Sequence, residues 1–86
     1  MMKVVLGEAS QPTKFGFAAS LKFSKKAVER NKVKRWMREA VRARIEDIQP
    51  GREVVFLINP KFPKSKLNLQ LIQESIEKLL ESAKIL

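Results

Sequence analysis

The side chains that could do chemistry in this sequence are mostly cationic, and they are concentrated in one stretch. Residues 14–44 contain eleven Lys or Arg against two carboxylates, Glu29 and Glu39. The excess of nine in this stretch equals the net charge of +9 of the whole chain, because residues 1–13 and 45–86 are each balanced. Positive charge gathered in one block between neutral ends predicts a polyanionic partner.

Three arginines in this block are spaced for a helical ridge. Arg35, Arg38 and Arg42 follow one another at intervals of three and four residues, so on a helix they share one side. The apolar positions on the opposite side are Val33, Met37 and Val41. Guanidinium groups on a rigid helix suit bidentate contacts with phosphate. The other cations of the predicted site stand beside the ridge or before it: Lys22, Lys25, Lys26, Arg30 and Lys34.

A solvated basic face is the alternative interpretation of this block. Glu39 and Glu46 could pair with the arginines of the ridge. Two carboxylates cannot neutralise the block, so charge segregation favours contact with nucleic acid.

The residues available for catalysis by the protein itself are few. The sequence contains no histidine, cysteine or tyrosine, and Asp47 is the one aspartate. This composition removes most general acid–base and nucleophilic mechanisms, thiolate metal sites and disulfides. The carboxylates are scattered, without the spacing of a metal-binding loop. We therefore expect no catalytic residue, no metal site and no bound cofactor in the protein.

Apolar periodicity predicts the first half of the fold. Residues 3–6 form a short strand, and residues 8–13 a loop. The alternation from Phe15 to Phe23 predicts a second strand with one apolar face and one face of small or cationic groups. Apolar residues from Val33 to Ile48 recur at helical spacing, with Asn31 as the predicted N-cap.

The second half of the chain adds a strand and a helix. Pro50-Gly51 is predicted to end the first helix. Residues 53–58 are apolar on both faces, as in a central strand that is covered on both sides or paired in parallel. A closing helix is predicted from about residue 68 to residue 84. This order predicts an α+β fold, a small two-layer sandwich whose mixed sheet has its helices on one face and its other face open.

Length and hydropathy set the organisation of the chain. Its 86 residues suffice for one domain, so residues 1–86 are interpreted as a single unit. No apolar run approaches the ~18 residues of a membrane span, and the N-terminal apolar stretch is too short for a secretory signal. We expect a cytoplasmic protein.

One segment resembles a known family. Residues 27–35 read Ala-Val-Glu-Arg-Asn-Lys-Val-Lys-Arg and are followed by Arg38-Glu39. They closely resemble the signature of the bacterial ribonuclease P protein, which is Arg-Asn, two residues, Lys-Arg, two residues, Arg-Glu. Gly16 and residues 20–26 resemble the strand and loop that precede this signature. The resemblance covers about residues 14–86, and the fixed spacing of the signature positions makes it specific.

The resemblance implies a function and a set of contacts. The chain would be the protein subunit of ribonuclease P, in which a catalytic RNA removes the 5′ leader of precursor tRNA with Mg²⁺. The subunit would be monomeric apart from RNA. The family's contacts with the catalytic RNA fall on Lys22, Arg30, Asn31, Lys34, Arg35 and Arg38, and the basic block adds Lys25, Lys26 and Arg42.

The resemblance also implies a leader-binding cleft between the sheet and an N-terminal helix. Phe15 and Phe17 are the nearby candidates for leader contact, because a base can stack on Phe. Their alternation with Phe23 makes core packing the stronger expectation for both. The family further implies a left-handed strand–helix–strand crossover, against the general preference for right-handed ones.

The sequence departs from the family at two places. Leu21 stands where the family has the first lysine of Ser-Lys-Lys, so one phosphate contact is in question. The family's N-terminal helix is not found, since residues 3–6 supply only a strand. The leader cleft would then be open or degenerate, or the sequence a minimal or truncated version.

Two other classes of protein remain as alternatives. A small structural RNA-binding protein of the ribosomal type would have the same charge pattern without the signature. A membrane-surface amphipath is the third interpretation, but the basic helix also carries acids and the last helix is balanced in charge.

Overall fold

The computed structural model describes residues 1–9 and 12–86, so Ser10 and Gln11 of the predicted 8–13 loop lie outside the described residues. Within these ranges the chain forms three strands, two α-helices and two short 3₁₀ turns. The elements, in chain order, are β1 (Met2–Glu8), β2 (Lys14–Ala18), α1 (Ala27–Arg42), a 3₁₀ turn (Ile45–Asp47), β3 (Arg52–Ile58), a second 3₁₀ turn (Lys64–Lys66) and α2 (Leu69–Ser82). The predicted α+β sandwich is confirmed.

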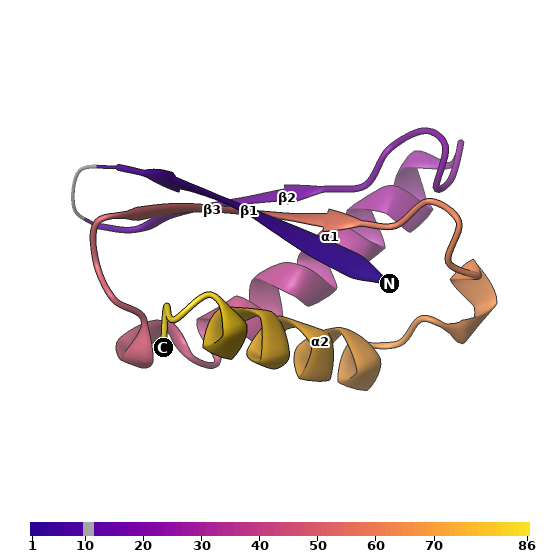
Figure 1. The fold of residues 1–86 in the computed structure, drawn as a ribbon. Coiled ribbons are helices and arrows are strands. Elements are labelled where there is room, and N and C mark those ends of the chain that lie inside the picture. Colours follow the sequence, from indigo (N-terminus) through magenta and orange to yellow (C-terminus); the bar gives the residue numbers. More distant parts are fainter. Residues whose placement is uncertain (10–11) are drawn as a thin grey trace.

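The sheet is mixed, with strand order β1-β3-β2. The central strand β3 pairs antiparallel with β1 and parallel with β2, and Phe56 has Val4 on one side and Phe17 on the other. The prediction of a central strand with a parallel neighbour is therefore confirmed. Figure 1 shows both helices below the sheet, with β1 in front and β2 behind. The chain passes from β2 through α1 to β3, and in this arrangement the crossover is left-handed.

The hydrophobic core lies between the sheet and the two helices. Alternate residues of β3 point into it, and Val54, Phe56 and Ile58 are buried. The helices meet this face with a stripe of side chains at helical spacing: Val33, Met37, Ala40 and Val41 from α1, and Ile72, Ile76 and Leu80 from α2. This stripe explains why both helices lie on the same side of the sheet.

The second face of the sheet carries no helix in the described residues. Lys3, Leu57 and Ala18 are aligned across the three strands on this face, because their neighbours along each strand point into the core. Gly16 lies beside Val55, and a Cβ at position 16 would come within 3.4 Å of Val55 Cγ2. Small residues therefore keep this face flat along β2, as predicted, and of the two interpretations of the apolar strand β3 the parallel pairing is the one that holds.

The second strand ends earlier than predicted. Alternation predicts a strand through residue 23, but β2 ends at Ala18. The backbone N–H groups of Phe23 and Ser24 both donate to the Ser20 carbonyl, so the chain turns there. The turn directs Phe23 into the core, where it is buried. The apolar alternation therefore extends past the end of the strand, because Phe23 is buried in the core from a turn.

The N-cap prediction for α1 is wrong. The helix begins at Ala27, and Asn31 lies in its second turn. Lys26 occupies the N-cap position without a side-chain cap bond. The Ser24 hydroxyl instead accepts a hydrogen bond from the Lys26 amide at 3.1 Å, so the preceding loop orders the helix start.

The end of α1 also differs from the prediction. The α-helix stops at Arg42, and residues 45–47 form a separate 3₁₀ turn in which Ile45 is 50% exposed. Arg44 leaves the helix axis and pairs with Asp47 at 3.4 Å and with Glu77 of α2 at 3.2 Å. The ion pair to α2 holds the chain at this bend, ahead of the predicted stop at Pro50-Gly51.

The closing helix starts where it was predicted. The Asn68 side chain accepts a hydrogen bond from the Leu71 amide at 2.8 Å, which makes Asn68 the N-cap of α2. No helix in the described ranges is long and apolar enough to cross a membrane.

Candidate nucleic-acid interface

Most of the cations of α1 lie on a different side of the helix from its acids. Successive residues turn by about 100° in an α-helix, which places Asn31, Lys34, Arg35, Arg38 and Arg42 within one arc of about 100°. The two acids, Glu29 and Glu39, fall on its other flank with Lys32 between them, and Glu29 pairs with Lys64 before α2. Arg35 and Arg42 lie opposite the buried stripe, whereas Arg38 lies at its border, closer to β2. The predicted ridge therefore forms, with one end beside the sheet.

The cations of this face are not neutralised by neighbouring carboxylates. The ion pairs of the described residues involve Arg44 and Lys64 as the cations. None of the predicted site cations takes part in one, and most of them are exposed. Unpaired positive charge on a rigid element attracts a polyanion strongly, because binding there breaks no existing ion pair.

The loop before α1 is held by a hydrogen-bond network around Ser24. Its buried side chain donates to the Glu29 carboxylate, and its carbonyl accepts from Arg30 Nη1 at 2.9 Å. Lys64 Nζ reaches the same carboxylate at 3.1 Å from the turn before α2. The hydrogen bonds from Ser24 and then Lys64 hold the pKa of Glu29 below its ordinary value of 4.5. A charged Glu29 thus ties together the two segments that flank the helix start.

This network places the remaining predicted cations. Lys22, Lys25 and Lys26 are exposed on the loop that the network holds, adjacent to the first turn of α1. The orphan amides of that first turn add positive potential at the same end of the helix. Arg30 differs from the others, because it is half-buried and its guanidinium is engaged with the Ser24 carbonyl. Arg30 therefore stabilises the loop before α1 and also adds its charge to the cationic side of the helix.

Phe15 and Phe17 lie on the helix side of the sheet, away from its open face. They stand next to Val54 and Phe56 in the parallel register. The Phe17 ring is stacked on Phe56, with ring centroids 6.0 Å apart and an interplanar angle of 10°. The Arg38 guanidinium lies 5.6 Å from the centroid of the Phe17 ring. Both aromatics therefore belong to the α1 side of the molecule, as core packing requires.

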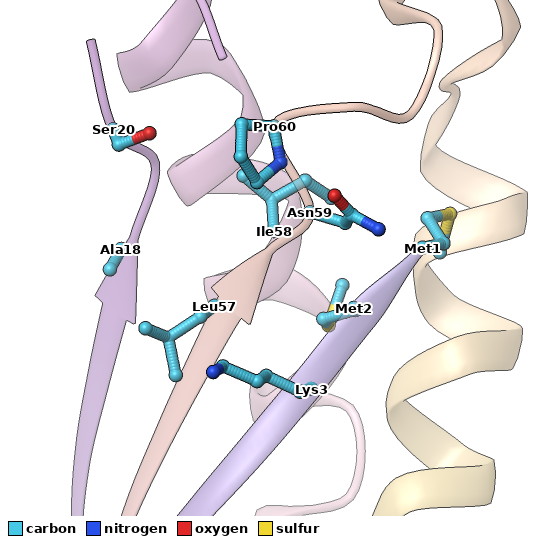
Figure 2. A pocket seen from close by; sticks show the side chains of 9 residues that line it. All are labelled: Met1, Met2, Lys3, Ala18, Ser20, Leu57, Ile58, Asn59 and Pro60. Carbon is cyan, nitrogen blue, oxygen red and sulfur yellow. The ribbon is translucent and has the colours of Figure 1, made fainter. Parts of the chain in front are cut away.

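A pocket at one end of the open face was not predicted. It has a volume of about 490 Å³ and is formed where β1 begins and where β2 and β3 end. Figure 2 shows the Lys3 side chain extending from β1 toward Leu57 of β3, with Ser20 beyond the end of β2 and Asn59 beyond the end of β3. Period-two alternation could have placed Lys3 on this face. The contributions of Ser20 and Asn59 depend on strand ends that only the fold brings together.

The exposed cations of the α1 face suit phosphate binding. Across residues 1–9 and 12–86 no group of three His, Cys, Asp or Glu side chains is placed to hold a metal ion. Glu29 of the Ser24 network is paired with Lys64, and Asp47 and Glu77 are paired with Arg44. The Lys and Arg side chains of the cationic face are outside these ion pairs, and most of them are exposed to a ligand.

Comparison with known sequences identifies the family. The profile of the Ribonuclease P family matches residues 1–84. The chain belongs to this family. The ribonuclease P protein component of Rippkaea orientalis is 39% identical over 75 residues, which is 87% of this chain and 58% of that protein. The component of Picosynechococcus is 33% identical over 82 residues, 95% of this chain and 69% of that protein. The chain thus spans about half to two thirds of the length of such relatives.

Solved structures of ribonuclease P proteins have the same fold. The protein from Thermotoga maritima superposes with a TM-score of 0.82 at 26% identity, covering 94% of this chain and 76% of that one. The protein from Staphylococcus aureus gives a TM-score of 0.75 at 26% identity, covering 95% and 75%. The resemblance of the Arg30–Glu39 segment to the ribonuclease P signature is therefore confirmed at the level of the family and the fold.

Proposed function

We propose that this chain acts as the protein subunit of ribonuclease P, in which it binds the catalytic RNA and helps it to remove the 5′ leader of precursor tRNA. The proposal rests on membership of the ribonuclease P family. The observation that carries it is the segregation of unpaired cations on one side of α1, because the signature residues Lys34, Arg35 and Arg38 lie there.

In this proposal the protein supplies binding, and the RNA supplies the reaction. Cleavage of a phosphodiester needs an activated water, which Mg²⁺ generates in metal-dependent nucleases. The carboxylates of the described residues are not grouped to hold Mg²⁺. The metal would therefore be held by the catalytic RNA and the precursor tRNA. The role of this chain is to neutralise phosphate repulsion where the two RNAs approach.

The open face of the sheet is our candidate for contact with the precursor tRNA leader. It is flat along β2, where Gly16 and Ala18 leave room, and it leads to the pocket that Lys3 and Ser20 line. A single strand can lie on such a surface with its phosphates near Lys3. We prefer this face to Phe15 and Phe17 for leader contact, because both aromatics lie on the helix side of the sheet.

A structural protein of the ribosomal type is not favoured, since the family match covers nearly the whole chain. Reconstitution separates the two functions. A ribonuclease P RNA is assayed for cleavage of precursor tRNA at low Mg²⁺, with and without this protein. We expect cleavage to rise on addition of the protein.

Matched variants tie that stimulation to α1. Arg35→Ala should lose most of it, whereas Lys78→Ala, which removes an exposed charge from α2, should keep it. Both variants lower the net charge by one, so a difference between them cannot come from total charge. Stimulation that is absent in the wild type, or equal in the two variants, would contradict the proposal.

A further inference from the structure

A groove runs between the free edge of β2 and the end of α1. It has a volume of about 360 Å³ and lies on the helix side of the sheet, apart from the pocket on the open face. Its lining is Phe15, Phe17, Arg38, Val41, Arg42 and Ile45. Helix α1 ends at Arg42 and the chain bends, which places Ile45 at the border of the groove with half of its surface exposed.

The charges of the groove favour an anion. Two guanidinium groups line it and no carboxylate does. Within the described ranges neither arginine is paired with an acid, since the ion pairs there use Arg44 and Lys64. The rest of the lining is aromatic or aliphatic. A ligand that fits must therefore present both a flat apolar surface and a negative group.

Three planar side chains form a stack that leads into the groove. Phe56 is buried, Phe17 stacks on it with centroids 6.0 Å apart, and the Arg38 guanidinium lies over Phe17 at 5.6 Å. The guanidinium group of Arg38 is thus held near the Phe17 ring by a cation–π contact. Nucleobases stack on the planes of arginine side chains as they do on aromatic rings. The next layer of this stack has the shape and polarity of a base.

We propose that this groove binds a single unpaired nucleotide of the RNA that the ridge contacts. The base stacks on Arg38 and packs against Ile45, and its phosphate is held by Arg42. The inference rests on the proposed function and deepens it, because it divides α1 into two parts. Arg35 contacts phosphates of paired RNA, whereas Arg38 stacks on a base that is extruded from the RNA helix.

The test compares two RNA probes and two conservative variants. One probe is a fully paired RNA duplex, and the other is the same duplex with a single bulged adenosine. Arg38→Lys keeps the charge and removes the guanidinium plane, and Arg35→Lys makes the same change outside the groove. We expect Arg38→Lys to weaken binding of the bulged duplex on the order of fivefold more than it weakens binding of the paired duplex. Arg35→Lys should change the affinities of the two probes alike.

A second measurement locates the nucleotide. The chain has no cysteine, so Ile45→Cys and Leu6→Cys each introduce a single thiol. Leu6 is the matched control, because it is 42% exposed and lies on β1 at the other edge of the sheet. The bulged duplex should slow alkylation of the thiol at position 45 more than the paired duplex does, and neither should protect position 6.

Failure of the groove proposal can be distinguished from failure of the proposed function. The groove proposal would be overturned if Arg38→Lys weakened binding of the two duplexes equally or weakened binding of neither. Equal protection of the thiol at position 45 by the two probes would also overturn it. The proposed function would still stand if the wild-type protein stimulated ribonuclease P RNA. Loss of that stimulation would overturn the function itself.

Discussion

Arg35 and Met37 are two residues apart on α1 and have opposite surroundings. Arg35 is exposed on the cationic side, while Met37 is completely buried between the sheet and α2. We expect Arg35→Ala to weaken binding of ribonuclease P RNA by on the order of 1–3 kcal/mol, the worth of a charge-assisted contact, with little change in stability. Met37→Ala should instead lower the free energy of unfolding by about 2–5 kcal/mol, through lost burial and a cavity. RNA titrations and thermal melts of both variants check the separation.

The charge of Glu29 makes one contribution to stability dependent on pH. Hydrogen bonds from Ser24 and Lys64 lower its pKa in the folded protein below 4.5, so folding favours the carboxylate. The stabilisation is complete above the unfolded pKa and is lost as pH falls through the lower, folded pKa. The stability difference between wild type and Glu29→Gln should therefore be larger at about pH 7 than at about pH 3.

Thermal melts of the two proteins at both pH values measure this difference. Glu81→Gln on α2 is the control, and its difference from wild type should not follow the same course. A Glu29→Gln difference that stays constant with pH would show that the network does not depend on the charged carboxylate.

At the scale of elements, the two asparagines near the starts of the helices have different surroundings. Asn68 accepts from the Leu71 amide and caps α2, whereas Asn31 lies inside α1 and is exposed. Asn68→Ala should lower the free energy of unfolding by about 1 kcal/mol, because one amide of the first turn loses its partner. Asn31→Ala should change stability by less than that and weaken RNA binding instead. Urea denaturation of both variants gives the comparison, and equal losses would contradict these roles.

The elements were predicted unevenly for a physical reason. The apolar stripe of α2 and the apolar run of β3 identified their elements, because a helix face or a buried strand depends on residues close in sequence. The length of β2 and both ends of α1 were mispredicted. Phe23 is buried by a turn, and Arg44 is drawn toward Glu77 on another helix. Contacts between distant residues decide such boundaries, and a local pattern does not contain them.

At the scale of the whole molecule, RNA affinity should depend steeply on salt. The cationic side of α1 and the preceding loop offer unpaired charges that would each displace counterions from a phosphate. With ~5–8 such contacts, the logarithm of the binding constant should fall with the logarithm of salt concentration at a slope of roughly −4 to −7. Titration of ribonuclease P RNA over a range of KCl concentrations measures the slope. A slope near −1 would mean that the cations remain solvated in the complex.

The sequence by itself determined which kind of partner this protein suits. The net charge of +9, its confinement to residues 14–44 and the spacing of Arg35, Arg38 and Arg42 are properties of the residue order. The ribonuclease P signature lies within the same stretch. The family and the cationic side of the helix were therefore both predictable without a structure. These features survive any error in element boundaries, because helical spacing alone places the arginines together.

Only the tertiary structure decided what lies next to that face. Phe15 and Phe17 alternate in the sequence as either core or ligand-binding residues would, and the register of β2 against β3 places them on the helix side. The same register brings Phe17 under Arg38 and opens a groove that Ile45 borders. Lys3, Ser20 and Asn59 likewise meet at one pocket only because β1 begins where β2 and β3 end. Such neighbours are set by strand pairing and by a crossover between distant segments, and a one-dimensional period carries no information about either.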